Sequence, residues 1–234
     1  MNYKKKGVLI YGGTGGIGLE VCKKFASENF DIFLTFRSNS KLKLAKLLIK
    51  KLHPNVNITS IKCDVTNEKD IINCAKITKR KKINYIINCV GFFEYDGYRK
   101  TTVKNLIKNF TINTLPTILI NKHIDYYKTK TSKLFIITIG SSSCYDGFFQ
   151  TISYCSSKHA LLGAIRSINK ELINKNILNI CVNPGSVKTK MGKKIKNQNY
   201  QSFIDAKEIA FFIFGLIKLN SIGYVEDVWI KRQI

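Results

Sequence analysis

Two side chains that can move a proton, Tyr154 and Lys158, stand four positions apart in a segment of helical period. Residues i and i+4 share one face of a helix, so the lysine ammonium would lie close to the phenol. A free phenol has a pKa of about 10 and is a poor acid or base at neutral pH, whereas a neighbouring cation lowers that pKa. The spacing therefore predicts a tyrosine suited to general acid–base chemistry.

The Tyr-x-x-x-Lys spacing alone does not select a site, because Tyr126 and Lys130 repeat it. Tyr154 is distinguished by Ser141, which stands thirteen residues upstream at the end of a predicted strand. The residue thirteen positions before Tyr126 is Asn113. We therefore take Tyr154 as the candidate catalytic tyrosine.

A glycine-rich loop follows the first predicted strand and opens the first predicted helix. Backbone N–H groups at a helix N-terminus, together with the helix dipole, bind phosphate, and glycine lets the backbone approach the ligand closely. The loop therefore predicts a dinucleotide site, whose members are Gly12, Thr14, Gly16, Ile17 and Gly18.

Short apolar runs alternate with longer segments of helical period, which is typical of βαβ units. The predicted strands are 7–11, 31–36, 57–63, 84–88, 134–139, 177–182 and 224–230, and the predicted helices are 17–28, 41–52, 68–79, 103–127, 154–174 and 206–219. Asp205 is the expected N-cap of the last helix. With 234 residues and 44% hydrophobic content, the chain can bury one core. The sequence thus predicts an α/β fold with one domain over residues 1–234. Its Rossmann-type, doubly wound, mostly parallel seven-stranded sheet would carry helices on both faces.

Five motifs in fixed order resemble the short-chain dehydrogenase/reductase family over nearly the whole chain. They are the G-x-x-x-G-x-G loop, Asn88-Cys89-Val90-Gly91, Asn113, the set of Ser141, Tyr154 and Lys158, and Asn183-Pro184-Gly185. The resemblance implies hydride transfer between a nicotinamide cofactor and a carbonyl or alcohol substrate. The nearest members are of the ketoacyl-carrier-protein reductase type, and enzymes of sugar or surface-polysaccharide pathways fit as well.

The resemblance also implies a role for each catalytic candidate. Ser141 would hydrogen-bond the substrate oxygen, and Tyr154 would donate or remove the proton. Lys158 would lower the pKa of the phenol and hold the nicotinamide ribose, while Asn113 would support a water relay.

Further cofactor contacts follow from the same resemblance. Asp64 would contact the adenine ring, and Thr189, four residues after Gly185, would bond the nicotinamide carboxamide. At positions 88–91 the family more often has Asn-Asn-Ala-Gly, and this chain differs from it at Cys89 and Val90. Both changes are small enough to preserve the turn. The remaining expected contacts complete a set of Asp64, Val65, Asn88, Val90, Gly91, Pro184, Gly185, Val187 and Thr189.

The end of the second predicted strand bears on which nicotinamide cofactor is used. An NAD enzyme usually places an acid there for the ribose hydroxyl, whereas an NADP enzyme places a positive charge for the phosphate. This chain has no acid at that point and carries Arg37 and Ser38, which can hold a phosphate. The sequence therefore favours NADP(H). The glycine loop has no basic residue, so NAD(H) stays open.

The formal net charge of +24 raises the question of an anionic partner. Only five of the 39 basic residues are arginine, and the lysines are scattered over nearly every predicted helix. Sequence-specific nucleic-acid binding is therefore not expected. Two interpretations stay open: an AT-rich codon bias, or attraction to a polyanionic substrate, a cofactor or an acidic carrier protein. A catalytically idle dinucleotide sensor or nucleic-acid-associated protein on the same fold is the alternative, which the intact Ser141, Tyr154 and Lys158 argue against.

The remaining composition bears on compartment and metals. Seven cysteines include no C-x-x-C pair and follow no secreted leader, which favours reduced thiols in the cytoplasm. The basic N-terminus runs into a short apolar strand and a glycine loop, and no apolar run approaches the roughly 20 residues that span a bilayer. His53, His123 and His159 lack metal-ligand spacing, so neither a metal nor a membrane segment is expected.

Two further expectations concern the substrate pocket and the assembly. Few residues separate Thr189 from the helix near Asp205, so the pocket would be open, with Phe92, Phe93, Phe148 and Phe149 as candidate walls. The helix of Tyr154 presents one stripe of small residues opposite its large apolar ones, which lets a second helix approach closely. We therefore expect a homodimer or homotetramer paired through this helix and the helix of Asn113. The stripe consists of Ser156, Ala160, Gly163 and Ser167.

Overall fold

The computed structural model describes residues 6–81, 83–127, 133–172, 175–219 and 225–232. Its centre is a seven-stranded sheet in the order β3-β2-β1-β4-β5-β6-β7, and all six strand pairs are parallel. The strand order reverses between β1 and β4, which is where ligands bind in open sheets of this kind. The strands are β1 Gly7–Tyr11, β2 Asp31–Phe36, β3 Ile58–Lys62, β4 Tyr85–Asn88, β5 Leu134–Ile139, β6 Ile177–Pro184 and β7 Asp227–Ile230.

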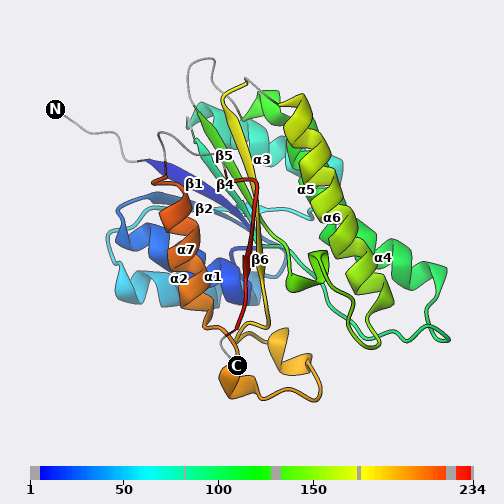
Figure 1. Cartoon of the computed structure of the whole chain (residues 1–234). Helices are drawn as coiled ribbons and strands as arrows, with labels where there is room; N and C mark the ends of the chain where they lie inside the picture. Colours follow the sequence, from blue (N-terminus) through cyan, green and yellow to red (C-terminus); the bar gives the residue numbers. More distant parts are fainter. Residues whose placement is uncertain (1–5, 82, 128–132, 173–174, 220–224, 233–234) are drawn as a thin grey trace.

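Helices cover both faces of this sheet (Figure 1). On one face, α1, α2 and α7 bury a core against β1, β2 and β6, with Phe25 and Phe214 in edge-to-face contact at its centre. On the other face, α3 and α5 cover β1, β4 and β5, and α6 packs beside them. The helices are α1 Gly16–Ser27, α2 Asn39–Leu52, α3 Glu68–Arg80, α4 Val103–Asn113, α5 Leu115–Lys122, α6 Ile152–Glu171 and α7 Ala206–Leu216.

The predicted α/β class, the doubly wound parallel sheet and the strand number are therefore confirmed. The predicted N-cap of α7 is also present, since the Asp205 carboxylate accepts from the backbone N–H of Lys207 at 2.8 Å. Most element ends lie within two residues of their predicted positions, and α6 begins two residues earlier, at Ile152. Tyr224, predicted in the last strand, and Lys130 lie outside the described residues.

The sequence predicts one long helix over 103–127, and this prediction is wrong. The structure divides it into α4, α5 and a 3₁₀ turn at Ile124–Tyr126. Pro116 stands in the first turn of α5, where it has no N–H to continue the hydrogen-bond ladder of the preceding helix. The break makes Asn113 the last residue of α4.

Candidate active site

The candidate residues gather at the carboxyl ends of the central strands. The loop after β1 leads into α1, and the loops after β4, β5 and β6 begin at the same edge of the sheet. Parallel strands bring such loops together even when they are far apart in the sequence.

The glycine loop forms a tight backbone turn. Gly12 has φ of +72°, and the Gly15 N–H donates to the Gly12 carbonyl at 2.9 Å. A Cβ at Gly18 would lie 2.3 Å from the Gly12 carbonyl oxygen, so α1 approaches the loop more closely than a side chain permits. Thr35 of β2 accepts from the Gly12 N–H at 3.1 Å. This compact turn at a helix N-terminus suits a dinucleotide pyrophosphate.

The segment after β6 reaches the glycine loop. A Cβ at Gly16 would lie 2.5 Å from the Thr189 methyl, which places Thr189 directly against the start of α1. The Thr189 hydroxyl oxygen accepts from the Gly192 N–H at 3.0 Å, and Val187 is buried. At the start of the segment, the Gly185 N–H donates to the Ile230 carbonyl of β7 at 2.9 Å. Pro184 is the last residue of β6.

Ser141 and Tyr154 come together from β5 and α6. The Ser141 hydroxyl faces the Tyr154 phenol and acts to lower the pKa of that phenol. The pKa of the phenol is nevertheless raised to about 12, because withdrawal from water disfavours its charged form more than Ser141 favours it. The sequence predicts that Lys158 lowers this pKa; the structure contradicts that prediction, because burial raises the pKa. The Phe93 ring meets the Tyr154 ring edge-on, with centroids 4.9 Å apart.

Lys158 lies one helical turn beyond Tyr154 on the same face of α6. Its Nζ is 5.9 Å from the centroid of the Tyr154 ring and donates to the Ile139 carbonyl at 3.1 Å. Only 2% of Lys158 is exposed, and burial lowers the pKa of its ammonium against the opposing influence of the Cys144 and Cys181 thiols. The structure therefore brings Ser141, Tyr154 and Lys158 into one cluster.

Asn113 ties the loop after β4 to α6. Its Oδ1 accepts from the Phe92 N–H at 2.7 Å, and its Nδ2 donates to the Phe92 carbonyl and to the Ser157 hydroxyl, both at 3.0 Å. Asn113 is buried beside Gly91. Asn88 holds the preceding turn, because its Oδ1 accepts from the Val90 N–H at 3.2 Å.

The end of β2 meets the loop after β3. The Arg37 guanidinium and the Asp64 carboxylate lie 3.9 Å apart, with side chains 66% and 45% exposed. Hydrogen bonds from Thr66, its backbone N–H first, hold the pKa of Asp64 below its usual value, and Arg37 adds to this. The Ser38 hydroxyl accepts from the Lys41 N–H at 3.4 Å and caps α2. Val65, next to Asp64, is buried.

Of the expected pocket walls, Phe93 contacts the site, whereas Phe149 is 82% exposed. The segment between Thr189 and α7 forms two short 3₁₀ turns, and its Lys196 N–H donates to the Tyr95 hydroxyl at 2.7 Å. No cluster of three or more potential metal ligands occurs among the residues that the structure describes. Within the same residues, no helix is long and apolar enough to cross a membrane.

Several contacts at the site involve residues to which the sequence assigned no role. Asn183 accepts from the Ser141 N–H at 3.3 Å, and Thr35 holds Gly12. Glu94 and Asp96, in the loop after β4, contact α4 and α6. All of these partners are distant in sequence, so no local spacing signals them.

This arrangement agrees with the comparison against protein families, in which the short chain dehydrogenase model matches residues 6–200. The chain belongs to that family. A very-long-chain 3-oxoacyl-CoA reductase of Caenorhabditis briggsae is 28% identical over 239 residues, covering 97% of this chain and 72% of that protein. A 3-oxoacyl-[acyl-carrier-protein] reductase of Mus musculus is 25% identical over 198 residues, covering 83% and 81%.

Solved structures are similar over almost the whole of this short chain dehydrogenase. ElxO with NADP bound superposes with a TM-score of 0.85 at 27% identity and covers 97% of both chains. Levodione reductase has a TM-score of 0.87 at 20% identity, covering 96% and 95%, which supports the fold. Family membership makes the protein an NAD(P)-dependent oxidoreductase of the short-chain type.

Proposed function

We propose that this protein is an NADP(H)-preferring ketone reductase, able in the reverse direction to oxidise the corresponding alcohol. One observation carries the proposal: Ser141 faces the Tyr154 phenol, and Lys158 lies one turn further on the same helix face. A dinucleotide sensor needs none of these three groups, which disfavours the idle alternative.

The proposed roles follow from these positions. Ser141 and Tyr154 bind the carbonyl oxygen of the substrate between their hydroxyls. A bound nicotinamide would supply the hydride to the carbonyl carbon. Tyr154 gives its proton to the oxygen as the alcohol forms, and Lys158 holds the nicotinamide ribose and favours the phenolate left behind. Asn113 supports the water relay that returns a proton to the phenol.

The proposed preference for NADP(H) rests on the end of β2. Arg37 is exposed there and lies 3.9 Å from its partner Asp64, so its guanidinium can turn to a phosphate. Ser38 caps α2, whose N-terminal N–H groups favour an anion. The NADP bound to the similar ElxO supports the same choice. NAD(H) would bind as the weaker cofactor.

We further propose a 3-oxoacyl thioester as the substrate class. Two relatives are named for reduction of 3-oxoacyl groups on coenzyme A and on a carrier protein. Beside the site, the segment before α7 exposes four lysines that suit the phosphates or acidic residues of such carriers. They are Lys190, Lys193, Lys194 and Lys196. Sugar ketones are the competing class.

The test follows NADPH consumption with a panel of 3-oxoacyl-coenzyme A esters, 3-oxoacyl carrier protein and keto sugars. Tyr154→Phe should keep NADPH binding and lower turnover by about 100-fold or more, the scale of a lost general acid. Tyr126→Phe is the matched control, because it removes a phenol from the repeated Tyr-x-x-x-Lys motif outside the site. Equal turnover of Tyr154→Phe and wild type would refute the assignment.

We also propose that the protein assembles as a homodimer or homotetramer in the cytoplasm. The small residues Ser156, Gly163 and Ser167 are exposed along α6, as such pairing requires. Beside them, Ile107 and Phe110 of α4 are exposed and line an apolar groove of about 320 Å³ between the two helices. All seven cysteines are free thiols, which suits a reducing compartment.

A further inference from the structure

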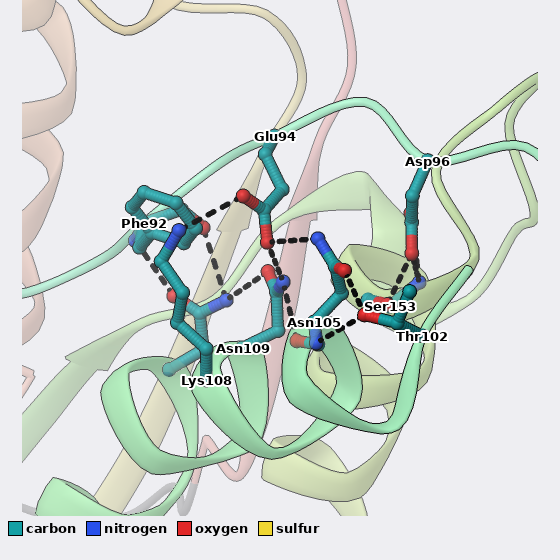
Figure 2. A network of polar contacts seen from close by, with 9 residues as sticks. Phe92, Glu94, Asp96, Thr102, Asn105, Lys108, Asn109 and Ser153 are labelled. Atoms are coloured by element: carbon teal, nitrogen blue, oxygen red, sulfur yellow. Dashed lines mark hydrogen bonds and ion pairs between the residues drawn. The ribbon is translucent and has the colours of Figure 1, made fainter. Parts of the chain in front are cut away.

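Five consecutive residues after β4, the 92–96 segment, each hold a different part of the candidate site. The Phe92 backbone binds Asn113, and the Phe93 ring contacts Tyr154. The next two side chains reach α4 and the segment before α7: Glu94 accepts from Asn109 at 2.8 Å, and Tyr95 accepts from Lys196. Asp96 ends the segment and reaches α6, and Figure 2 shows Glu94 and Asp96 with their partners.

The Asp96 carboxylate binds the first turn of α6. Its two oxygens accept from the backbone N–H of Ser153 at 3.1 and 3.2 Å, and the Ser153 hydroxyl donates to the carboxylate as well. The Asp96 N–H donates to the Gln150 carbonyl at 2.8 Å, directly before the helix. Asp96 is only 5% exposed, so these bonds form away from water.

The local sequence of α6 does not provide this cap. Thr151 stands at the N-cap position, but its hydroxyl donates to the Phe148 carbonyl at 2.8 Å and caps nothing. The first N–H groups of a helix have no partner within the helix and need one from outside. Asp96, which lies 57 residues before Ser153, supplies it. A negative charge at this end also complements the helix dipole.

Tyr154 follows Ser153 and belongs to this first turn. Two contacts from the 92–96 segment therefore place its phenol. The Phe93 and Tyr154 rings pack in a T-shaped contact, and Asp96 binds the neighbouring Ser153. If the first turn frays, the phenol moves relative to Ser141, which is fixed on the sheet by Asn183. Misplacement of a reacting group by about 1 Å can cost about 100-fold in rate.

We propose that Asp96 is a positioning residue that caps α6 from the loop after β4 and thereby sets Tyr154 for proton transfer. The inference rests on the proposed catalytic role of Tyr154. Asp96 acts through Ser153 and does not touch the reacting atoms.

Asp96→Ala should lower kcat by about 10-fold or more, while the Kd for NADPH stays within about 2-fold and KM changes less than kcat, since the cofactor loop is not touched. Asp96→Asn should restore kcat to within about 3-fold of wild type, because the amide oxygen still accepts from the Ser153 N–H. Hydrogen exchange of a peptide over 151–158 should be faster in Asp96→Ala than in wild type or Asp96→Asn.

Asp205→Ala provides the matched control, because it also removes a carboxylate cap, from α7 on the opposite face of the sheet. It should leave kcat and the exchange of the 151–158 peptide unchanged. Should Asp96→Ala fail to fold, Ser153→Ala removes only the hydroxyl bond and should lower kcat by a smaller factor. Wild-type kcat in the folded Asp96→Ala or Ser153→Ala variant would overturn the proposal, as would an Asp96→Asn variant as impaired as Asp96→Ala.

Tyr154→Phe separates this inference from the proposed function. If Tyr154→Phe keeps full turnover, the catalytic assignment fails and the Asp96 inference fails with it, even where hydrogen exchange shows a cap. If Tyr154→Phe loses turnover but Asp96→Ala does not, only the positioning role is overturned.

Discussion

Replacing Arg37 with Asp should reverse the cofactor preference without unfolding the protein. The Arg37–Asp64 pair is long, at 3.9 Å, and both side chains are largely in water, so it contributes at most about 1 kcal/mol to stability. A charge-assisted bond from Arg37 to the cofactor phosphate is worth about 1.5–3 kcal/mol. The Kd for NADPH should therefore rise by about 10- to 150-fold, and the introduced carboxylate would repel the phosphate further.

The Kd for NADH should change by less than about 3-fold, because NADH lacks the phosphate that Arg37 is proposed to bind. Titration calorimetry with each cofactor measures both constants on the same sample. Arg99→Asp is the matched control, since Arg99 is an exposed arginine before α4 and away from the end of β2. Equal weakening of NADPH and NADH would show that Arg37 has a structural role, and an unchanged NADPH constant would remove Arg37 from the cofactor site.

Three further outcomes follow from the structure. Gly18→Ala should abolish measurable NADPH binding in calorimetry, because its Cβ would lie 2.3 Å from the Gly12 carbonyl oxygen; unchanged binding would show that the loop can yield. Gly163→Trp should convert the oligomer to a 26.7 kDa monomer in light scattering, since outside its own helix nothing in the described part of the chain lies within 4 Å of the added Cβ; a wild-type monomer would refute the assembly. Burial raises the pKa of Tyr11 and of Tyr127, whose hydroxyls bond at 2.7 Å. The folded state therefore keeps protons that the unfolded chain loses above pH of about 10, and stability should fall there by up to about 1.4 kcal/mol per pH unit for each phenol. Chemical denaturation should show a smaller slope for Tyr127→Phe, and an equal slope would contradict the reasoning.

The sequence by itself determined the fold and most members of the candidate site. Hydrophobic periodicity places the strands and helices, because the pattern repeats within each element and needs no distant contact. The Gly12–Gly18 loop and the spacing of Tyr154 and Lys158 are equally local, since the turn and the helix face follow from neighbouring residues. Ser141 could be placed because it stands thirteen residues before Tyr154, just past a predicted strand.

Only the tertiary structure decided how these residues are held. The division of the helix over 103–127 depends on Pro116 and leaves Asn113 between Phe92 and α6, a contact that periodicity does not contain. Burial raises the pKa of Tyr154 where its spacing to Lys158 indicates a lowered one, because the exclusion of water from the phenol depends on groups far apart in the sequence. Asp96 caps α6 from 57 residues away. Contacts of this kind arise when the parallel strands bring their loops to one edge, and sequence spacing carries no record of them.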